Sequence, residues 1–165
     1  RREEVAFKGR IPEILNMFDP AFQRHEWLLT CELPKHPVTA WLPPEVVEQP
    51  LINLLDNAQH HLRNWGEVRV AVRRAPEDQA CPIHIEIHDQ GLGMTAEQLD
   101  QLFTPRVSSK GTKGYGLGLY TSRQLLRAVG GDLEVIRSAC FRWLGSGFRI
   151  RLPDQVASQS TGEAA

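Results

Sequence analysis

Two segments of the chain alternate between apolar and polar residues in the manner of a half-buried strand. They are EVRVAVR (67–73) and IHIEIHD (83–89), and a period of two places every second side chain on the same face of a sheet. The turn-prone segment APEDQACP separates them, so we predict a β-hairpin. Strand composition also marks WLLTCEL (27–33) and VTAWL (38–42) around the turn PKHP, and later DLEVIR (132–137) and GFRIRLP (147–153).

Apolar residues at helical spacing predict the helices. A wide apolar stripe over residues 46–62 predicts an amphipathic helix that begins after the two prolines 43–44. Near the N-terminus the same spacing is interrupted by Pro12 and Pro20, so we expect one short helix between them.

Two further helices carry signals at their ends. Thr95 with Gln98 three residues later forms a capping box, which predicts a short helix up to Phe103. The segment TSRQLLRAV (121–129) predicts a helix that ends at Gly130, in the C-terminal cap position.

The order of these elements predicts an α+β fold. A mixed, mostly antiparallel sheet would carry its helices on one face, as a two-layer sandwich. The length of 165 residues suits one domain with a substantial core, which we place at residues 27–153. Residues 1–26 would form an N-terminal helical connector. The tail DQVASQSTGEAA (154–165) is too polar to order itself, so we expect it to be disordered.

Composition excludes several function classes. The 19 basic and 20 acidic residues give a formal net charge of −1, which does not indicate nucleic acid or an anionic membrane as partner. No apolar run is long enough to span a bilayer, and the start RREEVAFKGR lacks a signal-peptide core. Cys31, Cys81 and Cys140 lack metal-ligand spacing, and their odd number favours a reducing compartment. We expect all three to be buried small hydrophobes.

A single acidic residue ends the apolar face of the second hairpin strand. The three isoleucines of residues 83–87 share one face, and Asp89 points the same way, toward the helices. Burial of an acid is costly unless hydrogen-bond donors meet it. Gly91 and Gly93 follow and would allow a ligand to approach the backbone closely. An ordinary turn is the alternative interpretation.

Asn53 and Asn57 lie one turn apart on the same face of the long predicted helix. An amide in mid-helix can hydrogen-bond core carbonyls. Its oxygen can also ligate Mg²⁺, which prefers oxygen donors and takes its remaining ligands from water and phosphates. These residues alone leave both interpretations open.

The segment GYGLGLYTSRQLL (114–126) places three glycines at alternate positions before a helix. Glycines that lead into a helix N-terminus expose backbone N–H groups and let phosphate oxygens come close, and the helix dipole adds attraction. Gly114, Gly116 and Gly118 could form such a phosphate cradle. The pattern by itself suits a flexible hinge equally well.

Four motifs occur in a fixed order, NLLDNA (53–58), DQGLGM (89–94), LF (102–103) and GYGLGL (114–119). This order resembles the N, G1, F and G2 boxes of the GHKL ATPase superfamily. It is most similar to the ATP-binding catalytic domain of bacterial sensor histidine kinases. The resemblance spans about residues 27–153 and implies the Bergerat ATP-binding fold, an α/β two-layer sandwich, with ATP and Mg²⁺ as cofactors.

The resemblance implies a role for each motif. Asp89 would accept a hydrogen bond from the adenine amino group, and Asn57 would hold Mg²⁺. Asn53 would be the catalytic residue that orients groups near the γ-phosphate, and Phe103 would anchor a lid. The other nucleotide contacts implied are Gly91, Gly93, Met94, Gly114, Tyr115, Gly116, Leu117, Gly118 and Leu119.

Some positions depart from the pattern of the superfamily or carry a less specific signal. His60 stands where Lys or Arg is common, and it carries full charge only at lower pH. His61 would lie near the adenine or on the surface. Tyr115 replaces a small residue and would pack over the nucleotide or cover the lid. Lys110 and Lys113 are candidates for the β- and γ-phosphates, with a solvated loop as the alternative.

The opposite face of the 83–89 strand carries His84, Glu86 and His88, which resemble a two-histidine, one-carboxylate metal site. This face is the solvent side of a two-layer fold, so we do not expect a metal there. The same exposed face would hold Arg69, Arg73, Arg149 and Arg151.

By resemblance, the chain would bind Mg-ATP and donate the γ-phosphate to a histidine on a dimerisation domain outside it, and would not autophosphorylate alone. The implied partners are that phosphoacceptor domain and a response regulator receiver domain, with no nucleic acid and no direct membrane contact. The domain would be cytoplasmic, within a parent protein that could reside in the inner membrane. The alternatives are a GHKL serine or protein kinase and a nucleotide-sensing module without phosphotransfer.

Overall fold

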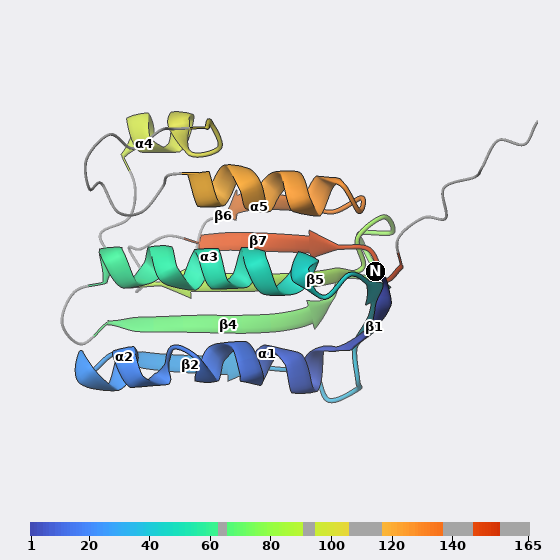
Figure 1. Cartoon of the computed structure of the whole chain (residues 1–165), viewed down its shortest axis with the longest axis horizontal. Helices are drawn as coiled ribbons and strands as arrows, with labels where there is room; N and C mark the ends of the chain where they lie inside the picture. Colours follow the sequence, from blue (N-terminus) through green and yellow to red (C-terminus); the bar gives the residue numbers. More distant parts are fainter. Residues whose placement is uncertain (63–65, 91–94, 106–116, 137–146, 156–165) are drawn as a thin grey trace, which may run out of the picture.

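Five strands form the central sheet of the computed structural model, which describes residues 1–62, 66–90, 95–105, 117–136 and 147–155. They are β2 (Leu28–Glu32), β4 (Glu67–Arg74), β5 (Ile83–Asp89), β6 (Asp132–Ile136) and β7 (Gly147–Leu152). Their order across the sheet is β2-β4-β5-β7-β6 (Figure 1). Strand β2 lies parallel to β4, and the other neighbouring pairs are antiparallel. The predicted mixed, mostly antiparallel sheet is confirmed.

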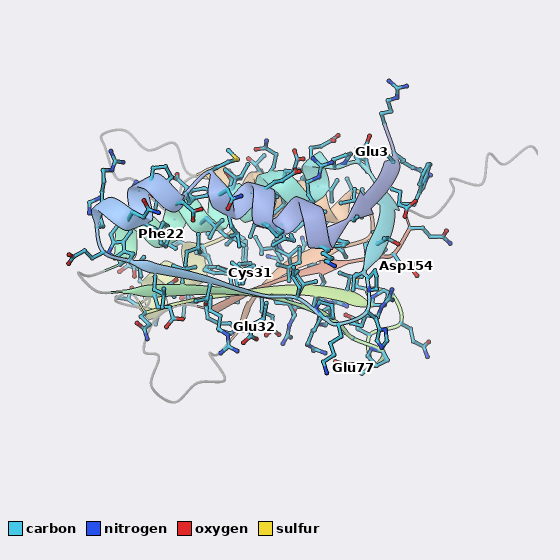
Figure 2. All side chains as sticks on the ribbon, turned by 90° about the horizontal axis from the view of Figure 1, so that it is seen from below. Glu3, Phe22, Cys31, Glu32, Glu77 and Asp154 are labelled. Atoms are coloured by element: carbon cyan, nitrogen blue, oxygen red, sulfur yellow. The ribbon has the colours of Figure 1, made fainter. Side chains whose placement is uncertain are left out.

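Helices cover one face of this sheet. They are α1 (Phe7–Asn16), α2 (Asp19–Arg24), α3 (Glu45–His61) and α5 (Leu117–Arg127). Figure 2 views the sheet from its edge, with helices on one side and the labelled Glu32 and Glu77 on the other. One apolar core fills the space between the layers and includes Leu51 and Leu55 of α3 and Ile85 of β5. The two-layer α+β sandwich is therefore confirmed.

The predicted β4–β5 hairpin is confirmed, and it determines where Asp89 lies. The register pairs Val72 with Ile85, Val70 with Ile87 and Val68 with Asp89. Because alternate residues share a face, Asp89 is the last residue on the core side of β5. Its side chain is buried, with 5% of the residue exposed.

The two strands on either side of the PKHP turn belong to different sheets. Strand β3 (Thr39–Leu42) pairs antiparallel with β1 (Glu3–Ala6), whereas β2 joins the central sheet. The chain after β7 returns to this small sheet, where the Trp41 N–H donates to the Asp154 carbonyl oxygen at 2.8 Å. Gln155 forms a bridge with Trp41 as well, so the chain is still paired two residues after Pro153. Residues 156–165 lie outside the described part of the chain.

The first 26 residues contain more regular structure than one short helix, so this prediction is wrong. Helix α1 begins at Phe7 and continues through Pro12, and α2 contains Pro20 near its start. Pro12 has no N–H to donate to the preceding turn, but buried apolar side chains hold α1 against the sheet. These side chains are Phe7, Ile11, Ile14 and Leu15. They belong to the same core as the rest of the chain.

The signals at the helix ends are confirmed. The Thr95 hydroxyl accepts from the Gln98 N–H at 3.1 Å, and the Gln98 side chain accepts from the Thr95 N–H at 2.9 Å. This capping box begins α4 (Ala96–Gln101). Gly130 follows α5 with φ of 87°, a left-handed conformation that favours glycine.

None of the helices in the described residues is long and apolar enough to span a bilayer.

The outer face of the central sheet is less exposed than its alternating pattern predicts. His84 and His88 are only 4% and 8% exposed. The reason is that the charged side chains on this face pair with each other and with the β4–β5 turn. The pairs are Arg151 with Asp78 and Glu134, His84 with Asp78, Arg149 with Glu86 and Glu134, Arg73 with Glu77 and Glu86, His88 with Glu86, and Arg69 with Glu32.

The cysteines do not all show the predicted burial. Cys81 is buried as expected, but Cys31 is exposed because it lies on β2 at the edge of the sheet. Cys140 lies outside the described residues. In the described chain, no group of three or more His, Cys, Asp or Glu side chains is placed to hold a metal ion.

Candidate active site

Asn53 connects α3 to the first turns of α5. Its amide nitrogen Nδ2 donates to the Gly118 carbonyl oxygen at 3.2 Å and to the Ser122 hydroxyl at 2.8 Å. Gly118 and Ser122 are four residues apart, so both acceptors lie on the face of α5 that meets α3. The structure therefore brings together the predicted residues Asn53 and Gly118, although they are 65 residues apart in the chain.

Asn57 lies one turn after Asn53 on the same helix, and its side chain is half-buried. Within the described part of the chain, no group hydrogen-bonds the Asn57 amide, which leaves its oxygen available to a ligand. An amide oxygen is a suitable ligand for Mg²⁺. The donor type at this position therefore fits the predicted cation.

Asp89 is held on the helix-covered side of the sheet, at the carboxyl end of β5. Helix α3 packs on this strand, so Asp89 faces the helix layer that contains the two asparagines. A buried carboxylate has a strong requirement for hydrogen-bond donors. A carboxylate can accept a hydrogen bond from a ligand that presents an N–H group.

The start of α5 presents backbone rather than side chains. Leu119 is fully buried in the core, so its side chain is not available to a ligand. Gly118 has no side chain, and a Cβ added there would lie 3.5 Å from Asn53 Cγ, which is an ordinary contact. Neither its backbone conformation nor internal packing requires glycine at this position.

Phe103 is anchored to α5 by Arg123. The guanidinium carbon Cζ of Arg123 lies 4.2 Å from the centre of the Phe103 ring, a cation–π contact. Arg123 Nε also donates to Asp132 at 3.1 Å. Burial raises the pKa of Asp132, but hydrogen bonds from Leu133, Arg123 and Arg127 outweigh this, so the pKa lies below its ordinary value. Phe103 is thus held through α5 to the start of β6.

His60 is exposed on the last turn of α3, and its Nδ1 lies 2.7 Å from the Asp56 carbonyl oxygen. A carbonyl oxygen can only accept, so Nδ1 carries the hydrogen. In the neutral ring Nε2 is then an acceptor, and His60 can donate to a phosphate through Nε2 only as the imidazolium. The predicted phosphate contact therefore requires protonated His60.

Several of the predicted site residues lie outside the described part of the chain. They are Gly91, Gly93, Met94, Lys110, Lys113, Gly114, Tyr115 and Gly116. His61 and Leu117 lie within helices, but their side chains are not described. Sequence reasoning missed Ser122 and Arg123. The signal for Ser122 was a serine one turn after Gly118, on the buried side of a predicted helix.

A profile of the family described as "Histidine kinase-, DNA gyrase B-, and HSP90-like ATPase" matches residues 44–156, which is more than half of the chain. The adaptive-response sensory kinase SasA of Microcystis aeruginosa is 28% identical over 144 residues, covering 86% of this chain and 36% of that protein. The two-component sensor PprA of Pseudomonas aeruginosa is 31% identical over 164 residues, covering 96% of this chain and 17% of that protein.

The chain therefore spans about a third or less of the length of these relatives. Among solved structures, the nucleotide-free catalytic domain of histidine kinase ThkA has a TM-score of 0.80 at 19% identity, covering 94% of this chain and 97% of that chain. The mycobacterial sensor histidine kinase MprB has a TM-score of 0.71 at 24% identity, covering 93% and 99%. These two likenesses show a shared fold. The profile match over more than half of the chain leads to one conclusion: the chain belongs to the family of histidine kinase-, DNA gyrase B- and HSP90-like ATPases.

Proposed function

We propose that this chain is the catalytic part of a sensor histidine kinase, which binds Mg²⁺-ATP and donates the γ-phosphate to a histidine outside the chain. The observation that carries the proposal is that Asp89 faces the helix layer in which α3 presents Asn53 and Asn57, with Asn53 bonded to the first turns of α5. Membership in an ATPase family supplies ATP as the nucleotide.

Each residue then has a chemical task. Asp89 accepts from the exocyclic amino group of adenine, and the backbone at the start of α5 binds phosphate oxygens with the help of the helix dipole. Asn57 holds Mg²⁺, which neutralises charge on the phosphates when bound. Phe103, fixed by Arg123, anchors the segment that follows it.

The partners of the proposed kinase are a phosphoacceptor-histidine dimerisation domain and a response regulator receiver domain. The support is that SasA is called a sensory kinase, ZraS of Klebsiella oxytoca a sensor histidine kinase, and PprA a two-component sensor. We further propose a cytoplasmic location for the domain, within a parent protein that could reside in the inner membrane.

Changing Asn57→Ala tests the proposed cation site. Removal of the amide oxygen should weaken binding of ATP in the presence of Mg²⁺ by about tenfold, and binding of metal-free ATP much less, because the lost interaction is with the cation. Titration calorimetry with and without Mg²⁺ measures both. Gln59→Ala on the same helix is the matched control and should leave both affinities unchanged. Equal losses for the two forms of ATP would mean that Asn57 has a structural role instead.

Changing Gly118→Ala should have opposite effects on stability and on binding. Alanine favours a helix over glycine, so the free energy of unfolding should rise by about 0.5–1 kcal/mol. The methyl group would occupy the space that phosphate oxygens need, so the affinity for Mg²⁺-ATP should fall several-fold. Gly9→Ala on α1, where an added Cβ meets nothing within 4 Å, is the control. It should raise stability without changing affinity, and the same behaviour at Gly118 would exclude this residue from the phosphate site.

A further inference from the structure

The Asn53 amide uses both of its N–H donors inside the protein. The two acceptors are the Gly118 carbonyl oxygen at 3.2 Å and the Ser122 hydroxyl at 2.8 Å. A carbonyl oxygen cannot donate, so the amide atom that faces Gly118 must be nitrogen. The chemistry of its neighbours therefore fixes which way this amide is oriented.

Ser122 is the side chain that completes this arrangement. It is fully buried, with 0% exposed, on a helix whose other buried residues include Leu119 and Leu126. A buried hydroxyl among apolar neighbours is costly unless it forms hydrogen bonds. The Asn53 amide satisfies this requirement, and in return Ser122 accepts the second of its two hydrogens.

We propose that Ser122 is a positioning residue that locks the Asn53 amide, so that the oxygen Oδ1 is the only polar atom that Asn53 can offer to a ligand. The proposal rests on the proposed function and deepens it. Phosphate oxygens under these conditions only accept hydrogen bonds, so the locked Asn53 does not bond them directly. It accepts instead from a donor next to the phosphates, a water molecule or an N–H group.

This orientation gives Asn53 a definite part in the reaction. A water molecule or a histidine N–H that attacks the γ-phosphate must be held with a lone pair toward phosphorus, which requires an acceptor for its hydrogen. Asn53 Oδ1 can be that acceptor only while the amide cannot turn over. Loss of Ser122 frees one N–H and leaves the amide held by one hydrogen bond, to the Gly118 carbonyl oxygen, instead of two, so the amide turns over more readily.

The lock is tested first by nuclear magnetic resonance on the ¹⁵N-labelled 165-residue chain. The Asn53 side-chain N–H₂ signals are identified by their loss in Asn53→Asp. Ser122→Ala should shift one of the two proton signals and speed its exchange with solvent, and Ser122→Thr, which keeps the hydroxyl, should retain the wild-type signals. Unchanged Asn53 signals in Ser122→Ala would overturn the proposal, whatever the protein binds.

The consequence for the reaction is tested by release of phosphate from Mg²⁺-ATP labelled at the γ position. Ser122→Ala should lower kcat about tenfold and change KM by less than about twofold, because the substrate remains bound while the attacking group is misplaced. Ser122→Thr should restore kcat, and Gln124→Ala on the exposed side of α5 should have no effect.

The outcomes separate this proposal from the proposed function. An increase in KM without loss of kcat would show that Ser122 supports binding alone and would overturn its positioning role. Failure of the wild-type chain to bind ATP would contradict the proposed function, while the Asn53 signals would still decide whether the lock exists. If Ser122→Thr lowered kcat as much as Ser122→Ala, the positioning role would also be overturned, because the variant that keeps the hydroxyl would not restore activity.

Discussion

Replacing Asp89 with asparagine should weaken ATP binding about 10-fold to 100-fold. In the proposed site the Asp89 carboxylate accepts a hydrogen bond from the adenine amino group, and an asparagine can turn a donor toward that amino group instead. Loss of a hydrogen bond to a charged group, with both partners left buried, costs about 1.5–3 kcal/mol. Titration calorimetry with a non-hydrolysable ATP analogue measures the loss directly.

The same variant should change the preference among purines. Guanine carries a carbonyl oxygen where adenine carries the amino group, so an asparagine N–H₂ can donate to it. The affinity for GTP should therefore stay level or rise while the affinity for ATP falls. Asp100→Asn on the exposed face of α4 is the control, with no expected change for either nucleotide. Equal losses for ATP and GTP would indicate that Asp89 supports the fold rather than recognising the base.

The features that could be predicted from the sequence are those set by local patterns. The stripe over residues 46–62 predicted α3 almost to its ends, because one wide apolar face is sufficient to define a helix on a sheet. Strict alternation in β4 and β5 predicted both the hairpin and the side of the sheet on which Asp89 lies. The capping box at Thr95 likewise depends on residues three apart.

The features that could not be predicted depend on contacts between distant parts of the chain. Helix α1 continues through Pro12 because its apolar residues are buried against the sheet. The helix propensity of the segment alone cannot predict that burial. The bonds from Asn53 to α5 join residues 65 and 69 positions apart. Motif order could therefore indicate a common site, but it could not say which atoms of Asn53 remain available to a ligand.

The network on the outer face of the sheet also depends on contacts between distant residues, and we expect its loss to have a large effect on stability. Alternation predicted charged residues facing solvent, but Asp78 from the β4–β5 turn joins them into a network. Its carboxylate accepts from Arg151 at 2.7 and 3.0 Å and from the Cys81 N–H at 3.1 Å. It also contacts His84 Nε2 at 2.8 Å, while Arg73 approaches His84 Nδ1 at 3.3 Å. Because Arg73 can only donate, the hydrogen of a neutral His84 ring lies on Nε2 and is donated to Asp78.

Changing Asp78→Ala should therefore lower the free energy of unfolding by about 2–3 kcal/mol at pH 7, since it leaves a nearly buried histidine and an arginine without their main acceptor. Urea denaturation followed by circular dichroism measures the loss. Glu77→Ala, one residue earlier on an exposed side chain, is the control and should change stability little. A loss no larger for Asp78 than for Glu77 would show that the network contributes little to the fold.

The pH dependence of this loss identifies its electrostatic origin. Hydrogen bonds from Arg151, opposed by burial and assisted by His84, hold the pKa of Asp78 well below its ordinary value of about 3.9. A carboxyl with a lowered pKa in the folded state stabilises the fold above its unfolded pKa, and this stabilisation is lost as the pH falls toward the folded value. The difference in unfolding free energy between the wild type and Asp78→Ala should therefore be constant near neutral pH and shrink below about pH 4.

Glu86 provides an independent check on the same face of the sheet. The hydrogen bond with His88, opposed by burial and assisted by Arg149, lowers the pKa of Glu86 to about 2. Its stabilisation should be lost as the pH falls from about 4.3 toward that value. If the contribution of Asp78 stayed constant down to pH 2 while the wild type lost stability, the acid sensitivity would have to come from Glu86 and other carboxylates. If the contributions of both carboxylates are lost below pH 4, much of the acid sensitivity of this domain comes from the outer face of its sheet.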